Sequence, residues 1–138
     1  MMPINNEHKA NITNKIEKIF SLLNPTDAIK VNLPLAHNLG LNEAIIYSTL
    51  LSKYINLKKE NQLDLDEFFP MSVYEIQEQT ILTENQQRRA INTLMVRGLI
   101  VVKRKGLPAK RFFKLELDNL ARYLRPSDLK TKYRDENL

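Results

Sequence analysis

The sequence contains no cysteine and only three glycines among its 138 residues. Without cysteine the chain forms no disulfide, holds no cysteine-ligated zinc and performs no thiol catalysis, and it fits a reducing cytosol. Gly40 and Gly98 stand beside helix-like patterns, and Gly106 lies between two strand-like runs. Because each glycine ends a helix or turns a hairpin, none remains for a phosphate-binding loop of the Walker or Rossmann type.

The sequence also lacks long apolar runs and the usual arrangements of catalytic or metal-binding residues. No run approaches the roughly 20 apolar residues of a membrane helix, and the N-terminus has no apolar stretch that would act as a signal peptide. His8 and His37 do not have metal-ligand spacing, and no serine lies in a nucleophile elbow. We therefore expect a cytoplasmic protein with no membrane contact, no cofactor, no metal and no enzymatic activity.

What is present is an uneven distribution of charge. Residues 84–114 contain nine lysines and arginines but a single acid, Glu84, so this window carries +8. The whole chain carries +5, so the remaining residues sum to −3. A basic surface confined to one segment is typical of a protein that binds phosphate groups, whereas the alternative is merely a solvated lysine-rich surface.

The segment that leads into this window contains two helix-start signals and one helix-end signal. Ser72 and Glu75 have the spacing of a capping box, and Thr83 with Gln86 has the same spacing. Gly98 is placed to end the second helix in a left-handed conformation. The three residues before Thr83 are predicted to form a tight turn between the two helices.

Two strand-like runs follow the second helix. Residues 99–104 and 111–116 are separated by a basic loop, residues 105–110, and this arrangement predicts a hairpin. The order helix, turn, helix, strand, basic hairpin, strand is that of a winged helix-turn-helix. The predicted fold class is therefore α+β and mainly α, a winged helix-turn-helix with an extra N-terminal helix and a short C-terminal helix.

The rest of the chain is expected to surround this unit. We predict a flexible N-terminus over residues 1–10, a single winged-helix domain over residues 11–125 and a flexible tail over residues 126–138. The further elements expected are a helix from Asn11 to Leu23, an edge strand or an extended lead-in from Ile29 to Leu35, a helix capped by Asn42 that runs to about Ile55, and a last helix from Asp118 to Leu124.

The helix that begins at Thr83 is the candidate DNA-reading helix. Its outward residues near the N-terminus are Asn85, Gln86, Arg88 and Arg89. Arginine pairs with guanine through two hydrogen bonds, and asparagine and glutamine pair with adenine, so these side chains suit base edges in the major groove. The alternative is the exposed polar face that any globular protein has, but the turn before the helix and the hairpin after it favour DNA reading.

The hairpin is the candidate wing. Residues 103–111 carry five positive charges and no negative one, from Lys103, Arg104, Lys105, Lys110 and Arg111. Such a wing binds the phosphate backbone and makes the affinity depend on salt. The alternative is an edge hairpin that its lysines protect from aggregation, but five charges exceed what such protection needs.

The predicted N-terminal helix carries one apolar stripe, formed by Ile12, Ile16, Ile19, Phe20 and Leu23. Their spacings of 4, 3, 1 and 3 place them on a single helical face. The stripe predicts either packing on the same domain or pairing with a second copy, because many helix-turn-helix proteins read paired half-sites as homodimers.

Four pieces of the chain carry a resemblance to a known family: GLNEA at the start of a helix, then TENQQRRAINTL, GLI and the wing GLPAKRFFKL. Through them residues 29–116 resemble the winged-helix domains of DnaD-like and replisome-organiser proteins, which are replication proteins from phages and plasmids of low-GC Gram-positive bacteria. The resemblance implies binding of double-stranded DNA, with the helix from Thr83 as the reader and residues 103–111 as the wing.

Several processes begin with the same protein–DNA contact. We expect a role in replication initiation or organisation, or its control, with a replication protein as a further partner, although the resemblance itself implies DNA binding and not the same role. The alternatives are a centromere-binding adaptor of a plasmid or phage partition system, with a segregation protein as partner, and a transcriptional repressor. The alternative of another class is a protein-interaction module that keeps the fold without binding DNA.

Overall fold

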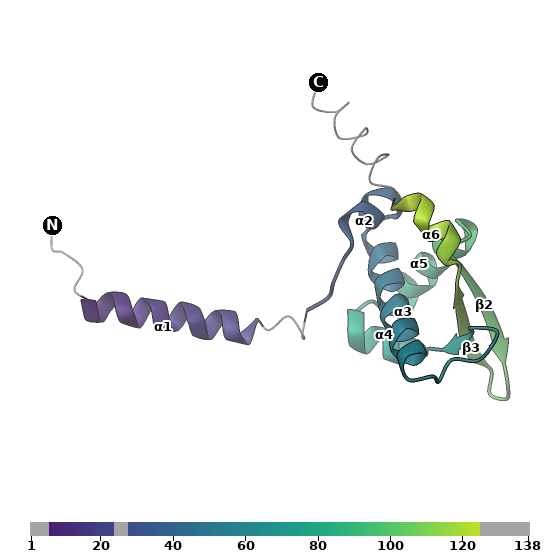
Figure 1. The fold of residues 1–138 in the computed structure, drawn as a ribbon, viewed down its shortest axis with the longest axis horizontal. Coiled ribbons are helices and arrows are strands. Elements are labelled where there is room, and N and C mark those ends of the chain that lie inside the picture. Colours follow the sequence, from purple (N-terminus) through teal and green to yellow (C-terminus); the bar gives the residue numbers. More distant parts are fainter. Residues whose placement is uncertain (1–5, 24–27, 125–138) are drawn as a thin grey trace, which may run out of the picture.

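The computed structural model describes residues 6–23 and 28–124, and within them the chain forms six helices and a three-stranded antiparallel sheet (Figure 1). The helices are α1 (Asn6–Leu22), α2 (Leu33–Leu39), α3 (Leu41–Lys59), α4 (Val73–Thr80), α5 (Glu84–Val96) and α6 (Leu117–Tyr123). The strands are β1 (Phe69–Pro70), β2 (Ile100–Lys105) and β3 (Lys110–Leu115). The expectation of a mainly helical α+β chain is confirmed.

Helix α3 lies at the centre of the packed part of the chain, where it contacts α2, α4, α5 and β3 (Figure 1). Its residues Ile46, Tyr47 and Leu50 are almost fully buried, and they share one apolar core with Phe69 and Phe113 of the sheet. Because α5 and the sheet both join this core, the core sets the position of the hairpin relative to α5.

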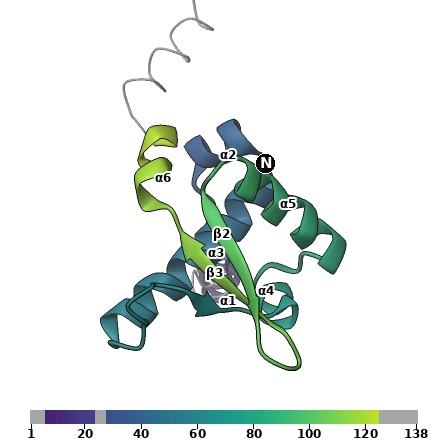
Figure 2. The same ribbon diagram turned by 90° about the vertical axis from the view of Figure 1, so that its right-hand side faces the viewer.

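The sheet has the strand order β1-β3-β2, with β3 in the middle. In the β2–β3 hairpin the paired residues include Ile100 with Leu115, Val102 with Phe113, and Arg104 with Arg111. Since directly paired side chains share a face, this face is apolar near the core and becomes basic toward the turn. The hairpin loop projects away from the packed helices (Figure 2).

Helices α4 and α5 are joined by a turn, and a side chain caps the start of each helix. The Glu75 N–H donates to Ser72 Oγ at 3.0 Å, and the Gln86 N–H donates to Thr83 Oγ1 at 3.2 Å. The Thr83 N–H in turn donates to the side-chain oxygen of Gln86 at 2.9 Å, which completes a capping box. The helix starts predicted at Ser72 and Thr83 are therefore confirmed. Between the helices, Ile81 has a left-handed φ of 60°.

The N-terminal third of the chain differs from the predictions. Helix α1 begins at Asn6, so residues 6–10, predicted as part of a flexible N-terminus, are helical. Of the edge strand or extended lead-in predicted over residues 29–35, the strand is wrong: residues 29–32 lead into α2, which Asn32 caps. The Asn32 side-chain oxygen accepts the Leu35 N–H at 3.0 Å. Pro34 lies in the first turn of α2, where backbone N–H groups have no partner within the helix, so the missing N–H of proline costs no helical hydrogen bond.

Helix α3 also has different bounds from those predicted. It begins at Leu41, so Asn42 is inside the helix and not its cap, and it continues beyond Ile55 to Lys59. Gly40 alone separates α2 from α3, with a φ of 112° that favours glycine. The last predicted helix is present as α6, and the predicted tail over residues 126–138 lies outside the described residues.

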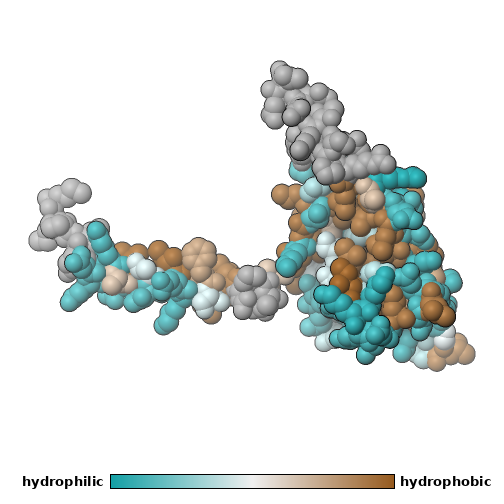
Figure 3. Space-filling view, viewed as in Figure 1, coloured by the Kyte–Doolittle hydropathy of each residue, from teal (hydrophilic) through white to brown (hydrophobic). Residues whose placement is uncertain are grey.

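Helix α1 stands apart from the packed helices and sheet (Figure 1) and has no buried residue. Apolar side chains follow one side of α1 and hydrophilic ones the other (Figure 3). The stripe is exposed, from 44% for Ile12 to 71% for Phe20. Of the two arrangements predicted for the stripe, packing on the same domain is therefore not the one found. None of the helices in residues 6–23 and 28–124 has the length and apolar character needed to cross a bilayer.

Candidate nucleic-acid interface

Helix α5 is held in place by its buried side. Ile91 and Leu94 pack into the core, and Gln87 is fully buried beside them. Nε2 of Gln87 donates hydrogen bonds to the carbonyl oxygens of Val73 and Leu82, each at 3.0 Å. One side chain therefore joins the start of α4 and the turn to α5, and it helps to set how the two helices lie.

The four predicted base-reading residues are all exposed at the start of α5. Arg88 and Asn85 bind each other, because Nη2 of Arg88 donates to Oδ1 of Asn85 at 2.9 Å. The side-chain oxygen of Gln86 is used within the capping box. To bind a base, these three side chains would therefore have to give up hydrogen bonds that they already make at the helix start. The Arg89 side chain makes no such bond to another described residue.

The predicted wing residues divide between the two faces of the hairpin. Lys103 and Lys105 lie on its outer face, the face opposite the apolar core. The ammonium of Lys103 lies 4.1 Å from the ring centroid of Phe68, and that of Lys105 lies 5.3 Å from the ring centroid of Phe112. Lys105 also forms an ion pair with Asp66 at 3.9 Å. These contacts hold the outer lysines against the segment that precedes β1.

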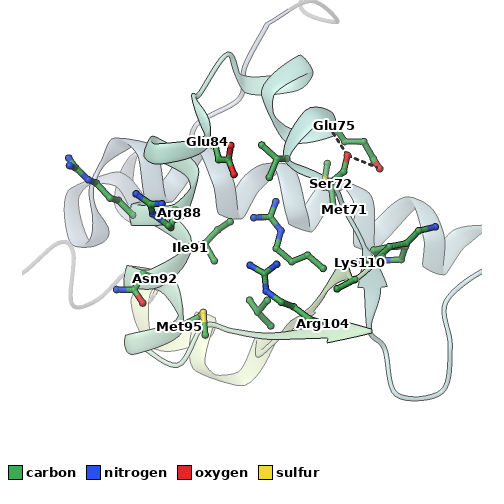
Figure 4. Close-up of a pocket in the computed structure, with 16 residues that line it drawn as sticks. Met71, Ser72, Glu75, Glu84, Arg88, Ile91, Asn92, Met95, Arg104 and Lys110 are labelled. Atoms are coloured by element: carbon green, nitrogen blue, oxygen red, sulfur yellow. Dashed lines mark hydrogen bonds between the residues drawn. The ribbon is translucent and has the colours of Figure 1, made fainter. Parts of the chain in front are cut away.

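Arg104 and Arg111 lie on the inner face of the hairpin, beyond the apolar pair of Val102 and Phe113. Between this face and α5 the molecule has a cleft of about 970 Å³ (Figure 4). The charged residues that line it from these two elements are Glu84, Arg88 and Arg89 of α5, and Arg104, Lys110 and Arg111 of the hairpin. Glu84 and Arg104 reach into the cleft from opposite sides (Figure 4).

Arg111 is the one predicted wing residue that is half-buried, since the other four are exposed. Its guanidinium carbon lies 4.9 Å from the ring centroid of Phe113. Burial, and after it the charge of Arg104, lowers the pKa of Arg111, while the charge of Glu84 acts in the opposite direction. Because an arginine side chain stays protonated in proteins, the cleft contains a permanent and partly desolvated positive charge.

Three features of the cleft differ from the sequence-based expectation. From the sequence, Glu84 is only the single acid of a basic window, whereas in the structure it lines the cleft among the cations. Helical spacing from the buried Ile91 would place Met95 inward, but it is 43% exposed on the cleft wall. The burial of Arg111 has a signal in the sequence, because strand alternation places Arg111 on the same face as Phe113 and Leu115.

The acidic residues before β1 are engaged with neighbouring groups. Oδ1 of Asp66 accepts the Phe68 N–H at 3.2 Å, and the Tyr54 hydroxyl donates to the carboxylate of Glu67. In the part of the chain that the structure describes, no group of three or more histidine, aspartate or glutamate side chains is arranged to hold a metal ion.

Comparison with known proteins bears on the fold. No protein-family model matches the chain, and no curated protein matches it. A solved structure described as the N-terminal domain of a DNA binding protein matches with a TM-score of 0.51 and 20% sequence identity, over 64% of this chain and 72% of that chain. At this identity the likeness concerns the fold, and it assigns no role to single residues.

Proposed function

We propose that the chain is a DNA-binding protein of the winged helix-turn-helix class, in which α5 reads the duplex and the β2–β3 hairpin is the wing. One observation carries the proposal: cations of α5 and cations of the hairpin line the same cleft. Helix and hairpin thus present one joined basic surface and not two separate solvated patches. The structural neighbour described as part of a DNA binding protein supports the proposal at the level of the fold. The role is one of binding and not of catalysis.

In this arrangement the start of α5 enters the major groove and the hairpin follows the phosphate backbone. The base-reading residues are Asn85, Gln86, Arg88 and Arg89. The phosphate-binding residues are Lys103, Arg104, Lys105, Lys110 and Arg111. The exposure of four of these five wing cations supports such contacts, and so does the outward projection of the hairpin loop (Figure 2).

Two substitutions separate base reading from phosphate binding. Arg89→Ala should cost about 1 to 3 kcal/mol of binding free energy on the preferred sequence and much less on other duplexes. Lys105→Ala should weaken binding to all duplexes alike and reduce the slope of log affinity against log salt by about one. Fluorescence anisotropy on labelled duplexes over a range of salt concentrations measures both effects.

Arg122→Ala is the matched control for these substitutions. It removes the same charge from an exposed position on α6, which lies at the end of the domain away from the hairpin loop (Figure 2). Its effect on binding should be small. If Arg89→Ala and Lys105→Ala bound as well as the Arg122→Ala control, the assigned DNA surface would be wrong.

The process that we propose is replication initiation or organisation, or its control, on a plasmid or phage, and the support is the resemblance of residues 29–116 to DnaD-like and replisome-organiser domains. Sequencing the fragments of replicon DNA that the protein retains at about 150 mM salt, close to physiological ionic strength, tests this. Spaced repeats at an origin would support it. Repeats beside a partition gene would indicate a centromere-binding adaptor, and a single palindrome over a promoter would indicate a repressor.

We also propose that two copies pair through α1, because its apolar stripe is exposed in the single chain. Ile16→Lys places a charge in the middle of the stripe and should abolish self-association. Asn14→Lys adds the same charge on the hydrophilic side of the helix and should leave it intact. Light scattering after gel filtration measures both masses. If the wild-type chain is monomeric at all concentrations, the stripe serves another protein, as in the alternative of an interaction module.

A further inference from the structure

The guanidinium of Arg111 is incompletely hydrogen-bonded in the structure. Its Nε and Nη2 atoms are buried, and neither has a hydrogen-bond partner among the described residues. A buried donor without a partner costs about 1 to 3 kcal/mol, and more when the group is charged. The ring of Phe113 contacts this guanidinium but offers its N–H groups no conventional acceptor. The group is therefore suited to a ligand that brings acceptor atoms.

Arg111 does not stand alone at this position. Arg104 is its direct partner in the β2–β3 register, so the two side chains leave the sheet on the same face. Both line the cleft between the hairpin and α5. Two neighbouring guanidiniums repel each other unless an anion lies between them, and the lowering of the Arg111 pKa by Arg104 reflects this repulsion.

The walls of the cleft strengthen electrostatic interactions inside it. Ile91 and Met95 of α5 and Val102 of β2 contribute apolar surface next to the arginines. An apolar lining lowers the local dielectric, so a charge-assisted hydrogen bond here is stronger than the same bond on an open surface. Arginine binds phosphate through two parallel N–H···O bonds, which suits an oxygen-rich anion better than it suits a single carbonyl group.

We propose that the cleft is a phosphate site in which Arg111 and Arg104 hold one backbone phosphate of a nucleic acid, and that Glu84 competes with this phosphate for their positive charge. The site deepens the proposed function and rests on it, since the phosphate belongs to the bound DNA. It differs from the outer lysines, whose ammonium groups already contact aromatic rings and Asp66.

Glu84 acts as the competitor because of its position at the start of α5. It lines the cleft opposite Arg104 (Figure 4), and its charge opposes the lowering of the Arg111 pKa. In the absence of DNA its carboxylate partly neutralises the two arginines. When a phosphate enters, the Glu84 carboxylate repels it, because both anions lie near the same arginines in one cleft. Removing this charge should strengthen binding.

The first experiment observes Arg111 directly in the full chain labelled with ¹⁵N. The arginine Nε–Hε signals are recorded while inorganic phosphate, and separately a short duplex of replicon DNA, is added. The Arg111 signal, assigned by its loss in Arg111→Lys, should shift with the duplex. A shift with phosphate as well would show that the site takes free phosphate. A shift with phosphate alone would overturn the assignment to nucleic acid.

The same titration separates the failure of this inference from the failure of the proposed function. If backbone amides of α5 and the hairpin respond to the duplex while the Arg111 side chain does not, the phosphate site is wrong and DNA binding stands. If no signal responds to the duplex, both are wrong. The titration itself uses the wild-type chain, and the Arg111→Lys variant serves only to assign the Arg111 signal.

The second experiment tests the competition. Glu84→Gln should raise duplex affinity by about fivefold, the factor that roughly 1 kcal/mol of charge interaction gives. Glu78→Gln removes the same charge from an exposed position on α4 that does not line the cleft, and it should change affinity by less than about twofold, as expected for an exposed charge screened by salt. Equal effects of the two substitutions would overturn the role of Glu84. Arg111→Gln should reduce the gain from Glu84→Gln, because it removes one of the two positive charges for which Glu84 competes.

Discussion

Helices α5 and α1 both carry an apolar stripe at helical spacing, yet the chain buries the first stripe and exposes the second. Leu94 of α5 is fully buried, whereas Ile16 in the middle of the α1 stripe is 48% exposed. Helix α5 has a complete capping box, a buried glutamine and contacts with α3, α4 and β2. Helix α1 has no buried residue. Apolar residues at helical spacing therefore identify the face of a helix that can pack. They do not show whether this face packs within the same chain or against another molecule.

The largest expected effect is the difference between truncating a buried residue of α5 and truncating an exposed residue of α1. Leu94→Ala removes buried methyl groups and leaves a cavity, so it should lower the free energy of unfolding by about 2 to 5 kcal/mol. Ile16→Ala should change it by less than about 0.5 kcal/mol at low protein concentration, because surface substitutions act weakly. Urea denaturation followed by circular dichroism measures both. A large loss from Ile16→Ala would mean that α1 packs on its own domain.

A smaller effect is expected from the polar group that α5 buries. Gln87→Ala leaves the carbonyl oxygens of Val73 and Leu82 without their donor, so it should cost about 1 to 3 kcal/mol. Gln79→Ala removes the same group from an exposed position on α4 and serves as the control. Equal urea midpoints for the two variants would show that the Gln87 hydrogen bonds add nothing to the joint between α4 and α5.

The turn before α5 should gain from a substitution. Ile81 holds a left-handed φ of 60° with its side chain 81% exposed, so it has backbone strain with little burial to offset it. Ile81→Gly should raise the free energy of unfolding by up to about 1 kcal/mol, since glycine adopts this conformation without strain. The urea midpoint would then increase. A decrease would indicate that the isoleucine side chain contributes packing that outweighs the strain.

The smallest effect at neutral pH is expected in α3, against which α5 packs. Burial, and after it the charge of Glu116, raises the pKa of Tyr47 to about 12. The folded state therefore disfavours the ionised phenol, and its contribution to stability is complete below pH 10 and is lost as the pH rises from about 10 toward 12. At pH 7, Tyr47→Phe should unfold at nearly the same urea concentration as the wild type. Near pH 11 it should unfold at a higher urea concentration than the wild type. Parallel losses in both proteins would contradict the assignment.

Much of the α4–α5 unit could be predicted because its signals are local. The caps at Ser72 and Thr83 and the left-handed Gly98 act within a few residues of sequence, and so does the hairpin. Asn32 and Pro34 are also local signals, because they indicate the start of a helix. The alternation of apolar and polar residues from Ile29 to Leu35 indicates extended chain instead. Burial of Leu35 and Leu39 against the core, which is a tertiary effect, decides for the helix.

The candidate site was predictable as a set of residues but not as an arrangement. The sequence places five cations in the wing, yet strand alternation sends Arg104 and Arg111 inward and Lys103 and Lys105 outward. The cleft itself depends on the distance between α5 and the hairpin, which the shared core around α3 sets. The sequence of a single segment does not contain this distance, so the position of Glu84 among the cations is seen only in the structure.

The small sheet offers little at either edge for another strand to join. Strand β1 at one edge has two residues, one of which is Pro70, without an N–H, and β2 at the other edge carries Lys103, Arg104 and Lys105. Association between copies is therefore steered toward helical surfaces. Net charge away from zero opposes aggregation, so the wing cations that we assign to DNA should also act against it. A variant that neutralises them all would become prone to precipitate, so its loss of binding has meaning only when it is measured on material shown to be free of aggregates.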